Sequence, residues 1–245
     1  MPMEKIEKYL CESVNMEIPP HELITIGGGE AMAPYMHGDT DYIPYALDLT
    51  FEHGFVPTLK TNGTWGDNDA LRAKVLSGIA NCAYKSGKLV TLDISVDEFH
   101  NNHSCIIKII KHVLNDSYLC PAIRFCLVGF NTKKSKFALD KIKQDLSRAG
   151  FQIFTTPIGD WEIYAKDGTG TYLINSFDGG IFNLGRAKEN RTFTTIHNPN
   201  NYIGMDCLQI DNNDNAILNY TYREKIQNRN INEVLSSLRQ HARGY

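Results

Sequence analysis

The sequence predicts an α/β fold built on a parallel sheet, and two observations support this. Apolar runs of β type begin near residues 22, 55, 88 and 122, about 33 residues apart, which suits one βα unit each. A segment with helical spacing of apolar residues lies between each pair of runs. The units share no repeated side-chain signature, so a solenoid of similar period is the less favoured alternative.

The chain is expected to begin with a helix. Met3, Ile6, Leu10 and Val14 have helical spacing, and the prolines of EIPPHE end this helix before a short strand at 23–26. The strand runs into GGGE, where consecutive glycines let a ligand approach the main chain without obstruction by Cβ atoms.

Three further units follow the first strand. YIPYALDLTFEHG is expected to be a helix ending at Gly54, and FVPTLKTNG a strand. Asp67 can cap the next helix, which Gly87 ends before the strand KLVTLDIS. The helix SCIIKIIKHVLND leads to the strand AIRFCLVGF, and the helix KSKFALDKIKQDLSRAG leads to FQIFTTP. The near-continuous apolar runs LVTLDIS and IRFCLVGF predict strands that helices bury on both faces.

The pattern changes from about residue 157. WEIYAKDGTGTYLINSF and CLQIDNNDNAILNYTY each read as a hairpin, and INEVLSSLRQHA as a last helix. We therefore expect an α/β core at 1–156 and a small α+β extension at 157–245. Four aromatic residues are expected to form the apolar face of the first hairpin: Trp161, Tyr164, Tyr172 and Phe177.

Composition and charge favour a globular protein without a nucleic-acid or membrane partner. The 245 residues are 42% hydrophobic, and 25 basic against 28 acidic side chains give a net charge of −3. No apolar run has transmembrane length and the first residues are charged, so a cytoplasmic location is expected. Six scattered cysteines fit reduced thiols better than a disulfide framework: Cys11, Cys82, Cys105, Cys120, Cys126 and Cys207.

Small or polar residues stand at the ends of the predicted strands. They are Gly27, Gly28, Gly29 and Glu30, then Thr61, Asn62 and Gly63, then Ser95, Asp97 and His100, and finally Gly129 and Asn131. Ligands bind at the carboxyl ends of parallel strands, so these residues predict a small-molecule site. The glycines do not form a dinucleotide fingerprint, because Met32 stands where GxGxxG needs another glycine, and no GxxxxGK[ST] occurs.

The order of GGE, TNG and SVDEFHNNH, one βα unit apart, resembles the radical S-adenosylmethionine (SAM) superfamily. FNLGRAKENR is similar to the GRA segment of many members, and CLQIDNNDNAI to a strand pair of their C-terminal extensions. The resemblance covers about residues 3–235 and implies a partial (β/α)6 barrel. It implies that residues 27–30 hold the methionine end of SAM, that Asn62 belongs to the TNG motif, that Ser95 and Asp97 approach ribose or carboxylate, and that Arg186 contacts the carboxylate or adenine surroundings. Ala31 replaces the proline of the family motif GGEP.

The family's chemistry also needs a [4Fe-4S] cluster held by CxxxCxxC, and this motif is absent from the sequence. The chain is therefore expected to begin inside the helix that follows the cluster loop, without the first strand. Cys11 is expected to pack against the apolar side of its helix, and Cys82 and Cys105 to pack on helical faces. The absent strand would leave a sheet edge open to a partner chain.

Two functions remain open at this point. With a cluster segment supplied elsewhere, the protein would be an enzyme that cleaves SAM reductively and abstracts hydrogen from an unknown small molecule or peptide. Without one, it would be a degenerate, non-catalytic binding or partner protein. His100 and His103 predict a helix entry rather than a metal site, and Asp167, Asp211 and Asp214 predict turns, because EF-hand spacing is missing.

Overall fold

The structure is a computed structural model, which describes residues 1–14, 23–26, 30–96, 102–129, 132–157, 159–176, 208–210, 215–218 and 222–243. It divides into two compact units. The main unit spans His21–Gly179, and the small unit combines Met1–Pro20 with Gly180–Tyr245. Within the described ranges, every helix is too short or too polar to cross a membrane.

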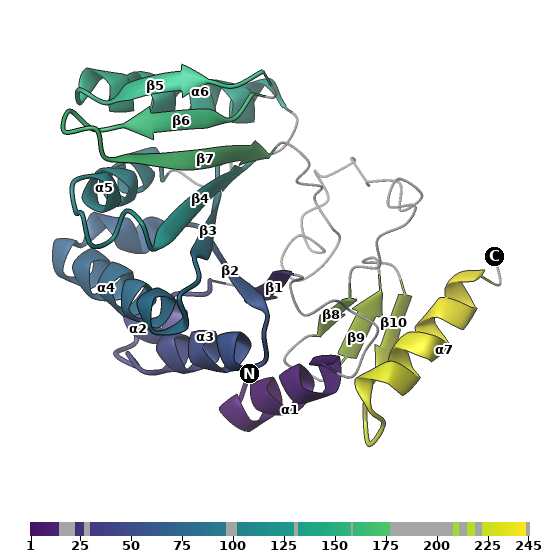
Figure 1. The fold of residues 1–245 in the computed structure, drawn as a ribbon. Coiled ribbons are helices and arrows are strands. Elements are labelled where there is room, and N and C mark those ends of the chain that lie inside the picture. Colours follow the sequence, from purple (N-terminus) through teal and green to yellow (C-terminus); the bar gives the residue numbers. More distant parts are fainter. Residues whose placement is uncertain are drawn as a thin grey trace. The chain divides into compact units, whose positions relative to one another are not determined.

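The main unit contains one seven-stranded sheet in the order β1-β2-β3-β4-β7-β6-β5 (Figure 1). The strands are β1 (Leu23–Ile26), β2 (Val56–Thr61), β3 (Val90–Ser95), β4 (Ile123–Val128), β5 (Gln152–Thr155), β6 (Trp161–Tyr164) and β7 (Gly170–Ser176). Strands β1 to β4 and β7 run parallel, while β6 and β5 pair antiparallel. The α/β fold with a parallel sheet is therefore confirmed; the sheet is open, with β1 and β5 as its edges in the described part of the chain.

Helices connect these strands much as predicted. They are α2 (Ala33–Met36), α3 (Tyr42–Glu52), the 3-10 helix η1 (Thr64–Asp67), α4 (Asp69–Ser86), α5 (His103–Leu114) and α6 (Lys133–Arg148). The cap of α4 is Asn68 and not Asp67, because the Asn68 side chain accepts the Leu71 N–H at 3.0 Å. Asp67 instead ends η1, and Gly87 closes α4 in the left-handed conformation with φ +67°.

Within the described residues of the main unit, the helices pack against one face of the sheet, which corrects the expectation that they bury both faces. Along β3, Val90, Leu92 and Ile94 are buried, whereas the side chains between them stay partly exposed. One core cluster joins the buried strand residues to α3, α4, α5 and α6. We call this the helix-covered face, and the other the open face. The alternation of apolar and polar residues in VTLDIS is typical of a strand that is buried on one face only.

Residues 152–176 belong to the main sheet, so the predicted boundary at residue 156 does not coincide with the compact units. The hairpin of β6 and β7 forms as predicted, but β7 pairs parallel with β4, where Phe125 lies opposite Leu173. The aromatic residues of this hairpin divide between the faces. Trp161 is buried on the helix-covered face, and Tyr164, three residues on, lies on the open face. The side chain of Tyr172, and Phe177, lie outside the described residues.

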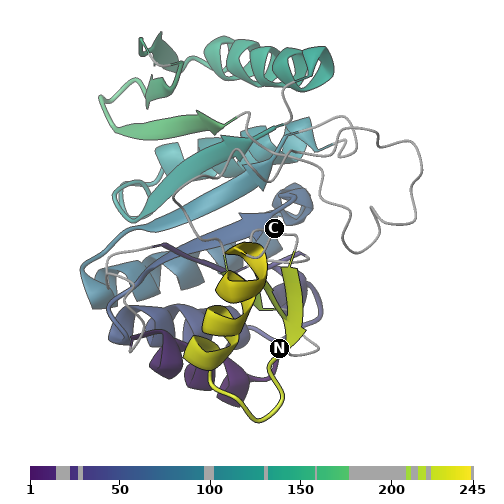
Figure 2. The same cartoon turned by 90° about the vertical axis from the view of Figure 1, so that its right-hand side faces the viewer.

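The small unit packs two helices with a three-stranded antiparallel sheet (Figure 2). Its elements are α1 (Met3–Val14), β8 (Leu208–Ile210), β9 (Asn215–Leu218), β10 (Tyr222–Lys225) and α7 (Ile231–Arg243). Tyr9 of α1 packs in a core with Val234 and Leu238 of α7. Glu12 accepts the Ile231 N–H at 2.8 Å and so satisfies a free donor at the start of α7. The first helix thus packs with the C-terminal elements.

Candidate functional site

Glu30 ties the chain that leaves β1 to the end of β2. Its Oε1 accepts hydrogen bonds from the Thr61 hydroxyl at 2.6 Å and from the Met32 N–H at 2.9 Å. Its Oε2 accepts the Asn62 N–H at 2.8 Å. Hydrogen bonds to a carboxylate are among the stronger ones in proteins, so this side chain positions the two strand ends relative to one another.

The TNG turn after β2 is held by its own side chains. The Thr61 hydroxyl accepts the Gly63 N–H at 3.0 Å and the Trp65 indole N–H at 2.8 Å. Asn62 Oδ1 accepts both the N–H of Thr64 at 2.9 Å and its hydroxyl at 2.7 Å, which is an Asx turn. Gly63 has φ +71°, and a Cβ atom there would lie 3.1 Å from Ile94. The positive φ therefore favours glycine, and a larger residue would also crowd Ile94.

Asn102 links the ends of β2 and β3. The residue is fully buried, and its Nδ2 donates to the main-chain oxygen of Asn62 and, at 3.0 Å, to that of Ser95. Its Oδ1 is buried and finds no donor among the described residues. Its place just before α5 is typical of a helix cap, but the side chain bonds to the strand ends instead and makes no cap bond.

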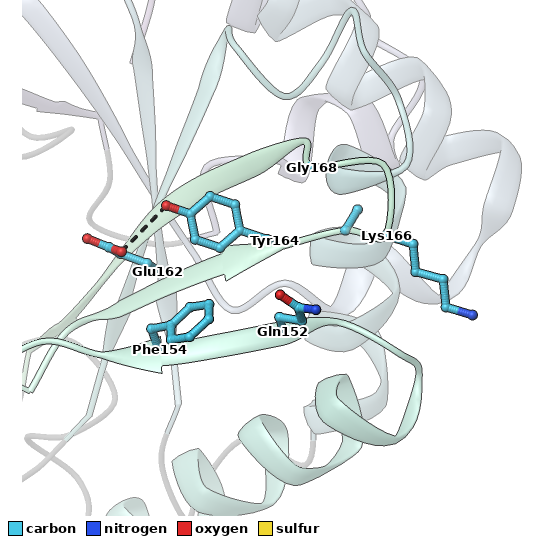
Figure 3. Close-up of a pocket in the computed structure, with 7 residues that line it drawn as sticks. Gln152, Phe154, Glu162, Tyr164, Lys166 and Gly168 are labelled. Carbon is cyan, nitrogen blue, oxygen red and sulfur yellow. Dashed lines mark hydrogen bonds between the residues drawn. The ribbon is translucent and has the colours of Figure 1, made fainter.

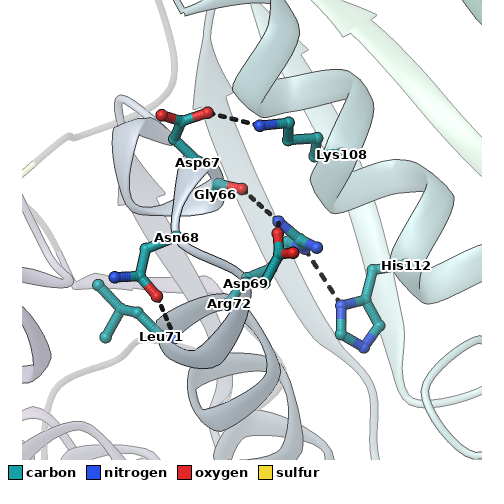
Figure 4. Close-up of polar contacts among 8 residues, drawn as sticks. All are labelled: Gly66, Asp67, Asn68, Asp69, Leu71, Arg72, Lys108 and His112. Atoms are coloured by element: carbon teal, nitrogen blue, oxygen red, sulfur yellow. Dashed lines mark hydrogen bonds and ion pairs between the residues drawn. The ribbon is translucent and has the colours of Figure 1, made fainter.

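A second set of contacts holds η1 from the outside (Figure 4). Arg72 donates to the Gly66 carbonyl at 2.6 Å and, through Nε, to His112 Nδ1 at 3.2 Å. Lys108 of α5 pairs with Asp67 at 2.6 Å. A Cβ atom on Gly66 would lie 2.8 Å from the Cys105 carbonyl, so η1 and α5 pack with no space for a side chain there. The turn at the end of β2 is thus held from two sides.

The chain segments that follow β3 and β4 also lie in direct contact with one another. Val96 N–H donates to the Val128 carbonyl at 2.7 Å. A Cβ atom on Gly129 would lie 2.8 Å from the Val96 carbonyl, so glycine permits this approach. The described carboxyl ends of β2, β3 and β4 therefore form a continuous edge of closely packed main chain.

Three ionisable residues lie in one row on the open face behind this edge. Lys60, Asp93 and Cys126 occupy matching positions on β2, β3 and β4. Burial raises the pKa of Asp93 above its usual value, although the Lys60 ammonium and the Cys126 thiol oppose this. Burial and the neighbouring Asp93 carboxyl raise the pKa of Cys126 to about 12. The thiol therefore stays protonated at neutral pH and hydrogen-bonds to Asp93.

Three of the predicted site residues fall among the described residues, and hydrogen bonds connect them. Glu30 contacts Asn62, and Asn102 joins Asn62 to Ser95 through their main-chain atoms. The others lie outside the described residues, so their roles stay predictions: Gly27, Gly28, Gly29, Asp97 and Arg186. His100, Asn131, Asp211 and Asp214 lie outside as well, whereas Asp167 forms the predicted turn by accepting the Thr169 N–H at 2.9 Å.

Histidine and cysteine do not gather into a metal site in the described part of the chain. His103 starts α5, and burial, with help from Lys141, lowers its pKa. Cys82 and Cys105 are buried as predicted, but Cys11 is exposed, which corrects the expectation that it packs. Cys120 is buried ahead of β4, donating to the Gly170 carbonyl at 3.2 Å, and Cys126 lies on the open face.

The sequence matches no protein-family model, and no curated protein matches it with significant similarity.

Proposed function

We propose that the main unit is a radical SAM-type domain, a partial (β/α) barrel in which the carboxyl edge of β1 to β4 binds SAM. The observation that carries this proposal is the network of Glu30, Asn62 and Asn102, which joins the ends of three successive parallel strands. Strands β1 to β4 also follow one another in sequential order with helices on one face, as the strands of (β/α) barrels do, and in those barrels sites form at the carboxyl ends of the strands.

The described residues at this edge have different roles in the proposal. Glu30 accepts three hydrogen bonds that position the edge, and its Oε2 accepts only one of them, so this oxygen has an acceptor site left for the methionine end of SAM. The Ser95 hydroxyl is half-buried and makes no hydrogen bond to any described residue, so it is available to a polar group of SAM. The buried, unpaired Oδ1 of Asn102 fits a donor that arrives at the same place. SAM would supply a sulfonium centre with reactive carbon–sulfur bonds.

The described cysteines do not fit a [4Fe-4S] cluster. Cys82, Cys105 and Cys120 are buried at separate places, and the pKa of Cys126 favours a protonated thiol, whereas the cluster needs three thiolates together. We therefore derive no redox step from these residues. This disagreement favours the second candidate, a non-catalytic protein that keeps the SAM edge and binds a small molecule or peptide. Cys82, Cys105, Cys120 and Cys126 are reduced thiols, which supports the cytoplasm as the compartment of this protein.

Isothermal titration calorimetry with SAM tests the proposal. We expect a dissociation constant in the micromolar range, weakened about tenfold by Ser95→Ala through loss of one hydrogen bond. Phe137→Ala, at an exposed position on α6, is the matched control and should leave the affinity unchanged. Absence of heat at millimolar SAM would refute the proposal.

Anaerobic reconstitution with iron and sulfide separates the two candidates. An EPR signal of a reduced [4Fe-4S] cluster that changes on addition of SAM would support the enzyme. SAM binding without iron uptake would support the binding protein.

A further inference from the structure

The far end of the open face carries an unassigned hollow between β5 and β6 (Figure 3). It has a volume of about 510 Å³. The lining residues are Gln152, Phe154, Glu162, Tyr164, Ala165, Lys166 and Gly168. We call it the β5–β6 groove. Gln152 and Phe154 on β5 lie opposite Tyr164 and Glu162 on β6, so all four side chains share the open face.

Two aromatic rings form adjacent walls of the groove. Phe154 and Tyr164 have ring centroids 6.0 Å apart and planes inclined at 69°. Phe154 is 55% exposed, although Ile153 beside it packs on the helix-covered core. The two rings touch edge to face, and the exposed ring of Phe154 keeps a face open, whose negative potential attracts a cation.

The charge beside these rings is negative. Glu162 accepts the Tyr164 hydroxyl at 3.4 Å, a distance longer than an ordinary O–H···O bond, so its oxygens can still accept a stronger donor. Figure 3 shows the Lys166 ammonium pointing away from the rings and from Glu162. An aromatic ring beside a carboxylate with a spare acceptor site suits a guanidinium group, which stacks on rings and donates hydrogen bonds to carboxylates.

The position of the groove indicates how the cation is presented. β5 is an edge strand, and within the described residues only β6 pairs with it. Its sequence QIFT lacks the lysine or proline that commonly protects sheet edges. An added strand would lie about 4.8 Å from β5 and about twice that from β6, so only a long side chain beside Phe154 reaches Glu162.

From these contacts we propose that the β5–β6 groove binds an extended peptide, which pairs with the edge of β5 and places an arginine side chain on the exposed ring of Phe154, next to Tyr164 and within reach of Glu162. This site is independent of the proposed SAM edge. Main-chain pairing supplies affinity, and the arginine supplies specificity.

Fluorescence anisotropy of the full chain with the labelled peptide Thr-Val-Arg-Val-Thr-Val tests the proposal. We expect saturable binding that weakens about tenfold when citrulline, a neutral isostere, replaces arginine. Phe154→Ala and Glu162→Gln should each weaken binding about tenfold, because each removes one contact of the guanidinium. Phe137→Ala removes another exposed phenylalanine, 71% exposed on α6, and should have no effect.

Several results would overturn the proposal. Equal affinity for the arginine and citrulline peptides would exclude recognition of the cation. Equal affinity for the peptide and for free N-acetylarginine methylamide would exclude strand pairing. Glu162→Gln keeps the side-chain shape, so unchanged binding by this variant would refute the site even if Phe154→Ala failed to fold.

Discussion

The two faces of the main sheet differ in what their residues do. On the helix-covered face, Leu92 and Phe125 are fully buried and pack against α4, α5 and α6. On the open face, the residues next to them along the strands are Asp93 on β3 and Arg124 and Cys126 on β4. Asp93 and Cys126 are partly exposed and Arg124 is exposed. Side chains alternate between the faces along each strand, so one short sequence serves stability and chemistry at successive positions.

We infer from this difference that the fold tolerates chemical variation on the open face and not on the helix-covered face. Apolar burial on the helix-covered face supplies the dominant favourable free energy of folding. The open face contributes less, so its polar residues are free to be selected for a ligand. Variants at neighbouring positions test this division, and the largest effect is expected in the core.

Phe125→Ala should lower the free energy of unfolding by about 4 kcal/mol, because it leaves a cavity among buried side chains on β4. Urea denaturation followed by circular dichroism measures this. Arg124→Ala, one residue earlier on the open face, is the matched control and should change stability by less than about 0.5 kcal/mol. Similar losses for both variants would contradict the division into two faces.

Asn102→Ala should cost about 2 kcal/mol, since it removes two hydrogen bonds and leaves the carbonyls of Asn62 and Ser95 without their donor. Asn115 at the other end of α5 is exposed, so Asn115→Ala is expected to be nearly neutral. Thermal unfolding of both variants gives the comparison. A neutral Asn102→Ala would show that the strand ends are held by other contacts.

Glu30→Gln should destabilise the protein by about 1 kcal/mol, because the amide nitrogen cannot accept the hydrogen bonds that one carboxylate oxygen accepts now. Glu52→Gln, at the exposed end of α3, serves as the control in the same urea titration. Equal stability of the two variants would remove Glu30 from the network.

Asp93→Asn should change the pH dependence of stability more than stability itself. The pKa of Asp93 is higher in the folded than in the unfolded protein. The protonated carboxyl therefore adds to the free energy of unfolding below the unfolded pKa, and this stabilisation is lost as the pH rises through the folded pKa. The variant should therefore gain stability relative to the wild-type protein as the pH is raised through that range. Denaturation midpoints from pH 3 to pH 7 measure this difference, and parallel profiles would contradict the raised pKa.

Most elements were predictable because their signals are local. Helical spacing located α1, α4 and α6, and apolar runs located β1 to β4. The positions of β5, β6 and β7 in the sheet were not predictable. The segment FQIFTTP resembles the next parallel strand, but β5 in fact pairs antiparallel with β6 at the edge of the sheet. Pairing between distant segments is a tertiary effect that a single-sequence pattern does not contain.

The site was predictable only in part for the same reason. Strand-end motifs predicted Glu30, Asn62 and Ser95. Glu30 accepts a hydrogen bond from Asn62, and Asn102 donates to the carbonyls of Asn62 and Ser95. Asn102 was missed because its role depends on the Asn62 carbonyl, forty residues earlier in the chain. The open face is not predicted because LVTLDIS resembles a near-continuous apolar run, although Thr91 and Asp93 mark a polar side.

Hydrogen–deuterium exchange with and without saturating SAM tests whether the carboxyl edge of β1 to β4 is the ligand site. The amides of Asn62, Gly63 and the first turn of α5 should exchange about tenfold more slowly with SAM, while those of β5 and β6 stay unchanged. Unchanged exchange at this edge under saturating SAM, or protection confined to another part of the main sheet, would contradict the account.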